Sequence, residues 1–345
     1  MGLPIIGNCH QLGPLIHRSF HKLSLHYGPL VSLRLGSVPC VVVISAEYAK
    51  EFLQNKELSF NSRGVTMVVT RIMKDSAGFA PYGPCWKFVR KLTMNELLGS
   101  RRTIYSFHSL RAKEYHRLLR FLDKKSETGE VVNLSEALVN STNTIISQMI
   151  LGWSQKAGEV IRDITQILGQ FNLADYIWFC KYLDLQEFGK RIEGIGKRFD
   201  AIAEREELRK KKKNGEADCE REQQQEKDFM DMLLDFVRDE NSDMKLMKVH
   251  LKSLLVDFFT AGTDTKANTI EWAVAELINN PKVLKKVRQE IDSVVQNNRL
   301  VNESDIPNLP YIQAIMTEIL RLHPAAPLIP RKCIKDCEIG NLVKN

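Results

Sequence analysis

The chain has 345 residues, of which 43% are hydrophobic and 26% are charged, and its formal net charge at pH 7 is +7. This composition excludes an intrinsically disordered chain, and the moderate positive charge does not select among an acidic protein partner, a membrane surface and nucleic acid. Seven cysteines without paired Cys-x-x-Cys spacing argue against a secreted disulfide framework and against a zinc site.

A short β-hairpin is predicted near the start of the chain, after a helix at about residues 17–26. Val31, Leu33 and Leu35 alternate with polar residues, and a β-branched run follows the turn at residues 36–39. From residue 46 onward, apolar side chains recur at helical spacing. Helices are expected at residues 46–54, 84–98, 110–125, 132–151, 157–171, from about 189 onward, 228–237 and 248–278. We therefore expect a mainly α fold with a small β-sheet (α+β), in a single domain that covers residues 1–345.

Residues 204–228 are almost all charged or amide and predict a charged mobile loop within this domain. Their "RKKKK" run is the kind of patch that binds nucleic acid or anionic lipid. Acidic residues on both sides and the lack of interleaved aromatics favour a solvated helix end that leads into a loop. We therefore expect no nucleic-acid partner.

Trp86 and Arg90 lie four residues apart in a predicted helix and therefore share one face. An indole N–H beside a guanidinium can hold a carboxylate or a phosphate, because arginine binds oxyanions through a rigid fork of donors. The alternative is a tryptophan at an interface with a surface arginine on its face, and this motif alone favours that alternative.

Glu318 and Arg321 are three residues apart on a helix that His323 and Pro324 bring to an end. Such a pair is usually an exposed salt bridge of little energetic consequence. Apolar neighbours such as Ile319 predict instead that part of the pair is buried, where the loss of one partner costs ~3–5 kcal/mol.

The predicted helix at residues 248–278 has a weak turn at its centre, around Gly262, Asp264 and Thr265. Glycine inside a helix costs about 1 kcal/mol relative to alanine, so the turn is not chosen for helix stability. Glycine permits the close approach of a flat ligand, and weak backbone bonding near Thr265 can open a groove where an acid and an alcohol relay protons. The alternative is a kinked core helix in which Asp264 caps locally.

Together, these three motifs resemble in order and spacing those of the haem-thiolate monooxygenases, the cytochrome P450 family. The resemblance extends from "LPIIGN" through "FAPYGPCWKFVRKL" and "DIPNLPYIQAIMTEILRLHP" to "RKCIKDCE". The chain looks like the plant microsomal type. The stretches "LTMNELLGS", "FNLADYIWFCKYLDLQEFGKRI" and "NSDMKLMKVHLKSLLVDFFTAGTDT" are most similar to flavonoid-pathway members such as flavone synthase II and flavanone 2-hydroxylase.

This resemblance implies a cytochrome P450 fold, a haem cofactor and a monooxygenase that takes electrons from NADPH through a flavoprotein reductase. Ala261 and Gly262 would lie against the porphyrin, while Asp264 and Thr265 would deliver protons for oxygen activation. The substrate would be a small hydrophobic plant metabolite, with a flavonoid (flavanone) favoured. Its contacts would come from residues 62–79, 171–180, the start of the helix at 248–278 and residues 326–329.

By the same resemblance, Trp86 and Arg90 would bind a haem propionate. Arg331, ten residues beyond Arg321, falls where family members often place another propionate-binding arginine. Glu318 and Arg321 would be structural and would lock the core beneath the haem.

The chain also departs from the family pattern. The family's iron ligand is a Cys in a Phe-x-x-Gly-x-Arg-x-Cys-x-Gly loop, and none of the seven cysteines has that context. We therefore expect no metal ligand in this chain, and a fold that is incomplete because the carboxyl-terminal haem-ligand region is missing. The family's amino-terminal membrane anchor and hinge are expected to be missing as well. Lys266 stands where many relatives carry a small side chain, and it either perturbs Asp264 or points away from it.

Two functions remain open on the sequence alone. In the first, the chain is part of a microsomal monooxygenase that acts at the cytosolic face of the endoplasmic reticulum membrane, and the activity belongs to the parent chain. Its basic helix around Arg90 would then suit an acidic reductase. In the second, the chain is a truncated, catalytically inactive product that acts at most as a binding or interaction protein.

Overall fold

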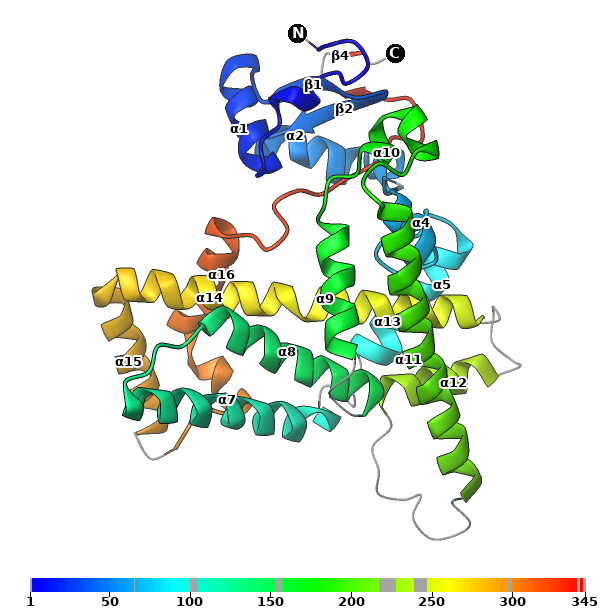
Figure 1. Ribbon diagram of the computed structural model, residues 1–345. Helices are drawn as coiled ribbons and strands as arrows, with labels where there is room; N and C mark the ends of the chain where they lie inside the picture. Colours follow the sequence, from blue (N-terminus) through cyan, green and yellow to red (C-terminus); the bar gives the residue numbers. More distant parts are fainter. Residues whose placement is uncertain are drawn as a thin grey trace.

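The computed structural model describes residues 2–64, 66–99, 105–152, 157–216, 228–238, 247–296, 299–339 and 342–343. Within these ranges the chain is mostly helical, with two small antiparallel sheets, as Figure 1 shows. The predicted fold class, mainly α with little sheet, is confirmed.

Helices make up most of the described chain, and each helix expected from the sequence is present. In chain order they are η1 (Cys9–Gln11), α1 (Ile16–Tyr27), α2 (Ala46–Lys50), η2 (Glu51–Asn55), α3 (Glu57–Phe60), α4 (Met67–Ile72), α5 (Pro84–Leu92), η3 (Thr93–Leu98), α7 (His108–Thr128), α8 (Leu134–Leu151), α9 (Ala157–Leu168), α10 (Leu173–Tyr176), η4 (Trp178–Tyr182), α11 (Phe188–Glu216), α12 (Phe229–Arg238), α13 (Lys248–Gly262), α14 (Asp264–Asn279), α15 (Pro281–Val295), η5 (Glu303–Asn308) and α16 (Pro310–Leu322). The segments η2 and η3 are π-helical and continue α2 and α5, so each of those two predicted helices is an α-helix with a π-helical end.

The predicted hairpin is formed by β1 (Leu30–Leu35) and β2 (Val38–Val43), which pair antiparallel. Its turn is shorter than predicted, because Val38 and Pro39 belong to the second strand and only Gly36 and Ser37 connect the two. Gly36 has a φ of 58°, a conformation that glycine adopts without steric cost. A second pair, β3 (Glu338–Ile339) with β4 (Leu342–Val343), lies close to the hairpin in Figure 1.

The prediction of a mobile loop over residues 204–228 is wrong for its first half. Residues 204–216 are the last turns of α11, because lysine, arginine and glutamate are good helix formers and are spaced to pair along a helix. Residues 217–227 lie outside the described residues. Asp228 directly precedes α12 and its backbone carbonyl accepts a hydrogen bond from the N–H of Met232.

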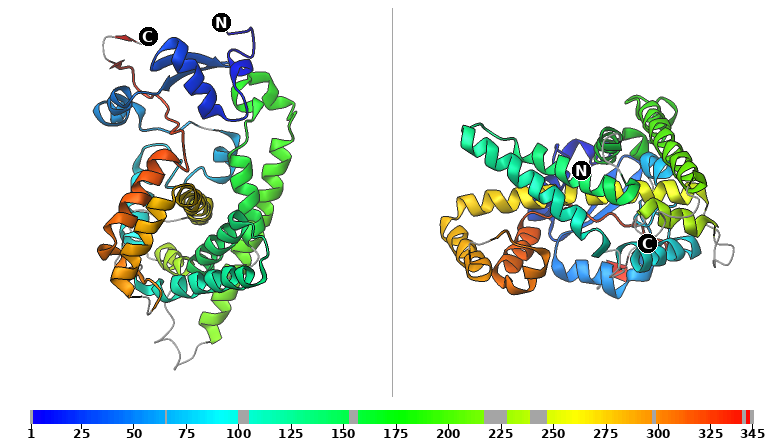
Figure 2. Two further views of the ribbon diagram at one scale, coloured as in Figure 1. Left: turned by 90° about the vertical axis from the view of Figure 1, so that its left-hand side faces the viewer. Right: turned by 90° about the horizontal axis from the view of Figure 1, so that it is seen from below.

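The centre of the molecule is occupied by α13 and α14, which cross it from end to end in Figure 1. Seen along their axis in Figure 2 (left), they lie between α7 and α8 on one side and α15 and α16 on the other. Leu254, Leu255 and Phe259 of α13 are among the most deeply buried side chains. Burying a side chain of this size contributes ~1.5–3 kcal/mol each, so α13 is a main support of the core.

The long helix predicted at residues 248–278 is divided at Thr263, which separates α13 from α14 with φ −93° and ψ −74°. The break stands in the turn that the sequence marks as weak. Gly262 is required here by packing: a Cβ at this position would lie 2.7 Å from Cδ1 of Ile146 on α8. The absent side chain therefore lets α8 approach α13 closely.

We predict that Gly262→Ala lowers the free energy of unfolding, although alanine is the better helix former. Overpacking against Ile146 costs ~1–3 kcal/mol, which exceeds the gain of about 1 kcal/mol in helix propensity. Urea denaturation of Gly262→Ala, Ile146→Val and the double variant measures the coupling. Because Ile146→Val removes the methyl group in conflict, the alanine should become neutral or stabilising in that background. A stabilising Gly262→Ala in the unaltered chain would contradict this account.

Candidate functional site

The break between α13 and α14 separates residues that face opposite ways. Ala261 and Thr265 are exposed on one side, and the Thr265 hydroxyl donates a hydrogen bond to the Ala261 carbonyl at 2.6 Å. Thr263 is 4% exposed, and its hydroxyl has no hydrogen-bond partner among the described residues. One side of the break, called the open side below, thus presents an alcohol and a small residue, and the groove expected there stays a prediction.

Asp264 is half-buried in the first turn of α14, where the partial positive charge of a helix N-terminus favours a carboxylate. No salt bridge joins Lys266 to Asp264 in the described part of the chain, and burial and the positive charge of Arg111 on α7 lower the pKa of Lys266.

The segment between α4 and α5 is attached to α13 by the carboxyl group of Asp257. Its Oδ2 accepts a hydrogen bond from the backbone N–H of Gly78 at 3.2 Å, and the Ala77 N–H and the Ser76 hydroxyl also bond to this carboxyl. Burial raises the pKa of Asp257 to about 6, against the opposing effect of these hydrogen bonds and of Arg90 nearby. Asp257 therefore holds the segment in place nearly two turns before the break.

Trp86 supports the same segment from the other side. Its indole Nε1–H donates to the backbone carbonyl of Ala77 at 3.0 Å, so in this structure the donor is engaged within the protein. Tyr82 packs against the indole ring with 5.5 Å between ring centroids. The contact between Trp86 and a haem propionate stays a prediction. In this structure Trp86 has a structural role, because its indole holds the segment between α4 and α5.

Three arginines gather from three distant parts of the chain: Arg63, Arg90 and Arg331. Burial of its guanidinium and the positive charges of Arg331 and Arg90 lower the pKa of Arg63. None of the three forms a salt bridge to a carboxylate in the part of the chain that the structure describes. Arg63 is half-buried, Arg90 and Arg331 are exposed, and the Asp257 carboxyl near Arg90 offsets part of the charge. Positive charge gathered in this way fits a group with two carboxylates.

The sequence motifs identified Arg90 and Arg331 but missed Arg63. It is brought in by a bridge between residues 59–63 and the segment after α16, in which the Lys332 N–H donates to the Ser62 carbonyl at 2.8 Å. The Arg63 Nη1 also approaches the Pro330 carbonyl at 3.4 Å. No local sequence motif predicts a bridge between segments so far apart in the chain, so Arg63 could be identified only from the fold.

The predicted pair of Glu318 and Arg321 is present but is not buried. Arg321 donates through Nε and Nη2 to both carboxylate oxygens, at 2.7 and 2.6 Å. The side chains of Arg321 and Glu318 are 66% and 52% exposed, so the expectation of partial burial is wrong. Ile319 is the buried residue of α16, and Tyr311, Ile312, Ile315 and Met316 are half-buried. Leu320 and Leu322 are exposed, and no described segment covers them.

A cavity of about 290 Å³ lies between four helices, α4, α9, α11 and α13. Its lining is mostly apolar and includes Ile72, Ile164, Phe199 and Val256, with Gly196 leaving open space on α11. Two of the four regions expected to contact a substrate, residues 62–79 and the start of the central helix, meet here. Residues 171–180 and 326–329 do not line it.

A search of the described residues finds no helix that is both long enough and apolar enough to cross a membrane.

We predict that Asp257 makes stability depend on pH between about pH 4 and about pH 6. Because its pKa is raised in the folded protein, the group stabilises the fold when protonated, and this contribution is lost as pH rises through about 6. The rise in the pKa of Asp257 from its ordinary value of 3.8 to about 6 corresponds to ~3 kcal/mol of folding free energy. Urea denaturation of the unaltered chain and of Asp257→Asn gives the difference between their free energies of unfolding. This difference should change by ~3 kcal/mol between about pH 4 and about pH 6, with the unaltered chain relatively more stable at low pH. A difference that does not vary with pH would contradict the prediction.

Comparison with known proteins agrees with the family that the motifs indicate. A family model described as cytochrome P450 matches residues 1–344. The chain is 51% identical to "Cytochrome P450 93B2" of Gerbera hybrida, over 95% of this chain and 66% of that protein. It is 45% identical to a 2-hydroxyisoflavanone synthase of Glycyrrhiza uralensis, over 98% of this chain and 66% of the relative.

A third relative, the 3,9-dihydroxypterocarpan 6A-monooxygenase of Glycine max, is 45% identical over 98% of this chain and 69% of its own length. The chain thus spans about two thirds of the length of these relatives. Among solved structures it resembles a zebrafish cytochrome P450 described with progesterone, with a TM-score of 0.75, 23% identity, and coverage of 95% of this chain and 76% of that one. At that identity the likeness supports the fold alone. The chain therefore belongs to the cytochrome P450 family, whose membership implies a haem cofactor.

Proposed function

We propose that this chain belongs to a plant monooxygenase that inserts one oxygen atom from O2 into a flavonoid, with a flavanone as the favoured substrate. Electrons would come from NADPH through a flavoprotein reductase, and the enzyme would act at the endoplasmic reticulum membrane. The observation that carries the proposal is the cluster of Arg63, Arg90 and Arg331, in which Arg63 is half-buried and is repelled by the other two. Relatives that act on isoflavonoid-type compounds support the substrate class.

The arginine cluster would bind the two propionates of a haem. Arg63 is partly buried and repelled by its two neighbours, so an anionic partner relieves both the burial and the repulsion. When bound, the haem supplies the redox-active iron that reduces O2. The protein supplies binding, orientation and protons.

On the open side of the helix break, Ala261 leaves room for a flat ring, and Thr265 and Asp264 would move protons. The Thr265 hydroxyl donates to the Ala261 carbonyl, and its oxygen can accept a hydrogen bond from a neighbour. To pass its proton on, the hydroxyl would release the carbonyl and take up a proton from that neighbour. Asp264 stands next to it at the helix N-terminus and would replenish that proton from solvent. We therefore assign Thr265 and Asp264 as the relay and Ala261 as a cofactor contact. The porphyrin contact of Gly262 stays a prediction, because the side of Gly262 that a Cβ would occupy faces Ile146.

We predict that replacing Arg63, Arg90 or Arg331 by alanine weakens haem binding by roughly 10- to 100-fold, the value of a hydrogen bond to a charged group. Titration of the chain with haem, followed by its absorption, gives the affinity. Arg63→Ala should not destabilise the haem-free chain, because it removes a charge repelled by its neighbours.

The matched control for this series is Arg288→Ala, an exposed arginine on α15. It should bind haem like the unaltered chain. Equal haem affinity in Arg63→Ala, Arg90→Ala and the control would remove the basis of the proposed haem site.

We predict that the cavity between α4, α9, α11 and α13 admits a flavanone, because its volume lies near the lower end of the range of small-molecule sites and its lining is mostly apolar. Gly196→Leu fills the open space with a side chain and should lower flavanone affinity at least roughly tenfold. Gly194→Leu, on the same helix and also unobstructed but not part of the lining, is the control. Equilibrium dialysis with naringenin measures both, and an equal effect of the two substitutions would place the substrate elsewhere.

A further inference from the structure

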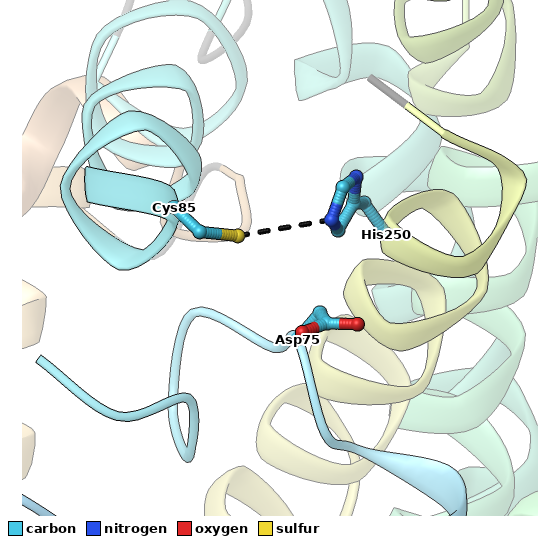
Figure 3. Close-up of side chains that lie close together, drawn as sticks. All are labelled: Asp75, Cys85 and His250. Carbon is cyan, nitrogen blue, oxygen red and sulfur yellow. Dashed lines mark hydrogen bonds between the residues drawn. The ribbon is translucent and has the colours of Figure 1, made fainter. Parts of the chain in front are cut away.

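Three potential metal ligands converge beneath the amino-terminal end of α13. Asp75 follows α4, Cys85 lies in the first turn of α5 and His250 lies in the first turn of α13. Figure 3 shows the Cys85 thiol and the His250 ring directed toward one another, with the Asp75 carboxyl group close by, and the ligand atoms of the three residues all lie within 4.8 Å of one another. We propose that Asp75, Cys85 and His250 form a binding site for Zn²⁺ or a similar late first-row divalent metal ion.

The donor set and its spacing suit such an ion. A thiolate, an imidazole and a carboxylate are the ligands that Zn²⁺ takes in proteins, with a fourth position left for water. The Cys85 Sγ lies 3.7 Å from His250 Nε2. Two ligands bound tetrahedrally at ~2.3 and ~2.0 Å from one ion stand roughly 3.5 Å apart, so this pair already has the required separation. Asp75 lies on an irregular segment and can close the remaining distance by a side-chain rotation.

The surroundings of the cluster favour a cation. His250 is 6% exposed, and Asp75 and Cys85 are half-buried. A divalent ion offsets the repulsion between a thiolate and a carboxylate at such a position, and its binding releases the thiol proton to solvent.

The ring of His250 must change one hydrogen bond to bind the ion. Its Nδ1 accepts from the backbone N–H of Met247 at 3.1 Å, so the neutral ring carries its proton on Nε2, toward the cluster. Coordination through Nε2 moves that proton to Nδ1 and frees the Met247 N–H. Met247 is 56% exposed, so water can take over this donor.

A metal ion here would join the segment between α4 and α5 to the central helix. Ser76, directly after Asp75, is one of the groups that Asp257 holds two turns further along α13. The ion would therefore fasten the same segment at a second point and act as a structural staple. Ligands at positions 75, 85 and 250 fit no short spacing motif, which is why the sequence argued against a zinc site.

The test uses the full chain with three cysteines outside the cluster replaced: Cys219, which is outside the described residues, and Cys333 and Cys337 near the carboxyl end. After dialysis against Zn²⁺, we expect one zinc per chain, and X-ray absorption at the zinc edge should show one sulfur ligand at about 2.3 Å among nitrogen and oxygen ligands. The melting temperature should rise with added Zn²⁺ by roughly 2–4 °C or more.

Cys85→Ser should remove the sulfur ligand and weaken Zn²⁺ binding at least tenfold, and Asp75→Asn should weaken it without removing the sulfur. Cys180→Ser, a buried thiol in a separate cluster with Ala174 and Ile177, is the matched control and should bind like the parent. Zinc bound without sulfur, Zn²⁺ affinity unchanged in Cys85→Ser, or no stoichiometric zinc and no thermal shift would each overturn the proposal. The last result would identify the trio as a hydrogen-bonded cluster only.

Discussion

The buried carboxyl group of Asp257 is the junction on which the candidate site depends. It joins the central helix to residues 76–78, the segment that also receives the Trp86 indole. Arg90 follows Trp86 by one turn, so its position relative to Arg63 is fixed through this junction. A buried acid is expensive unless its hydrogen bonds are satisfied, and here the backbone satisfies them. Asp257 and Ala261 lie one turn apart on α13 and share a face, so the segment is attached on the side of the helix that carries Ala261.

The helix break at Thr263 has one side that packs against α8 and one side that carries exposed residues of the candidate site. Gly262 lets α8 approach on one side, and the missing regular turn at Thr263 leaves Thr265 and Ala261 exposed on the other. The glycine is therefore explained by its contact with Ile146, independently of any ligand, while the acid and alcohol beside it are not explained by packing.

Local patterns were enough to predict the hairpin, most helices and the weak turn, because each depends on residues close in the chain. The Glu318–Arg321 pair was also foreseen, but its burial was not, since burial depends on what covers α16. Arg63 and the cluster of Asp75, Cys85 and His250 could not be predicted, because distant segments assemble them. The stretch "FNSRG", which contains Arg63, shows no functional pattern by itself. Its role depends on the segment after α16, which pairs with it in the folded chain.

The central claim is that Arg63, Arg90 and Arg331 bind the carboxylates of a haem. The most direct measurement compares the affinity of the chain for haem with its affinity for haem dimethyl ester, in which both propionates are neutral and the ring is unchanged. The account predicts that the ester binds at least roughly tenfold more weakly, because its carbonyls cannot offset the positive charge of the cluster. Equal affinity for the two would show that packing alone holds the ring and would contradict the account.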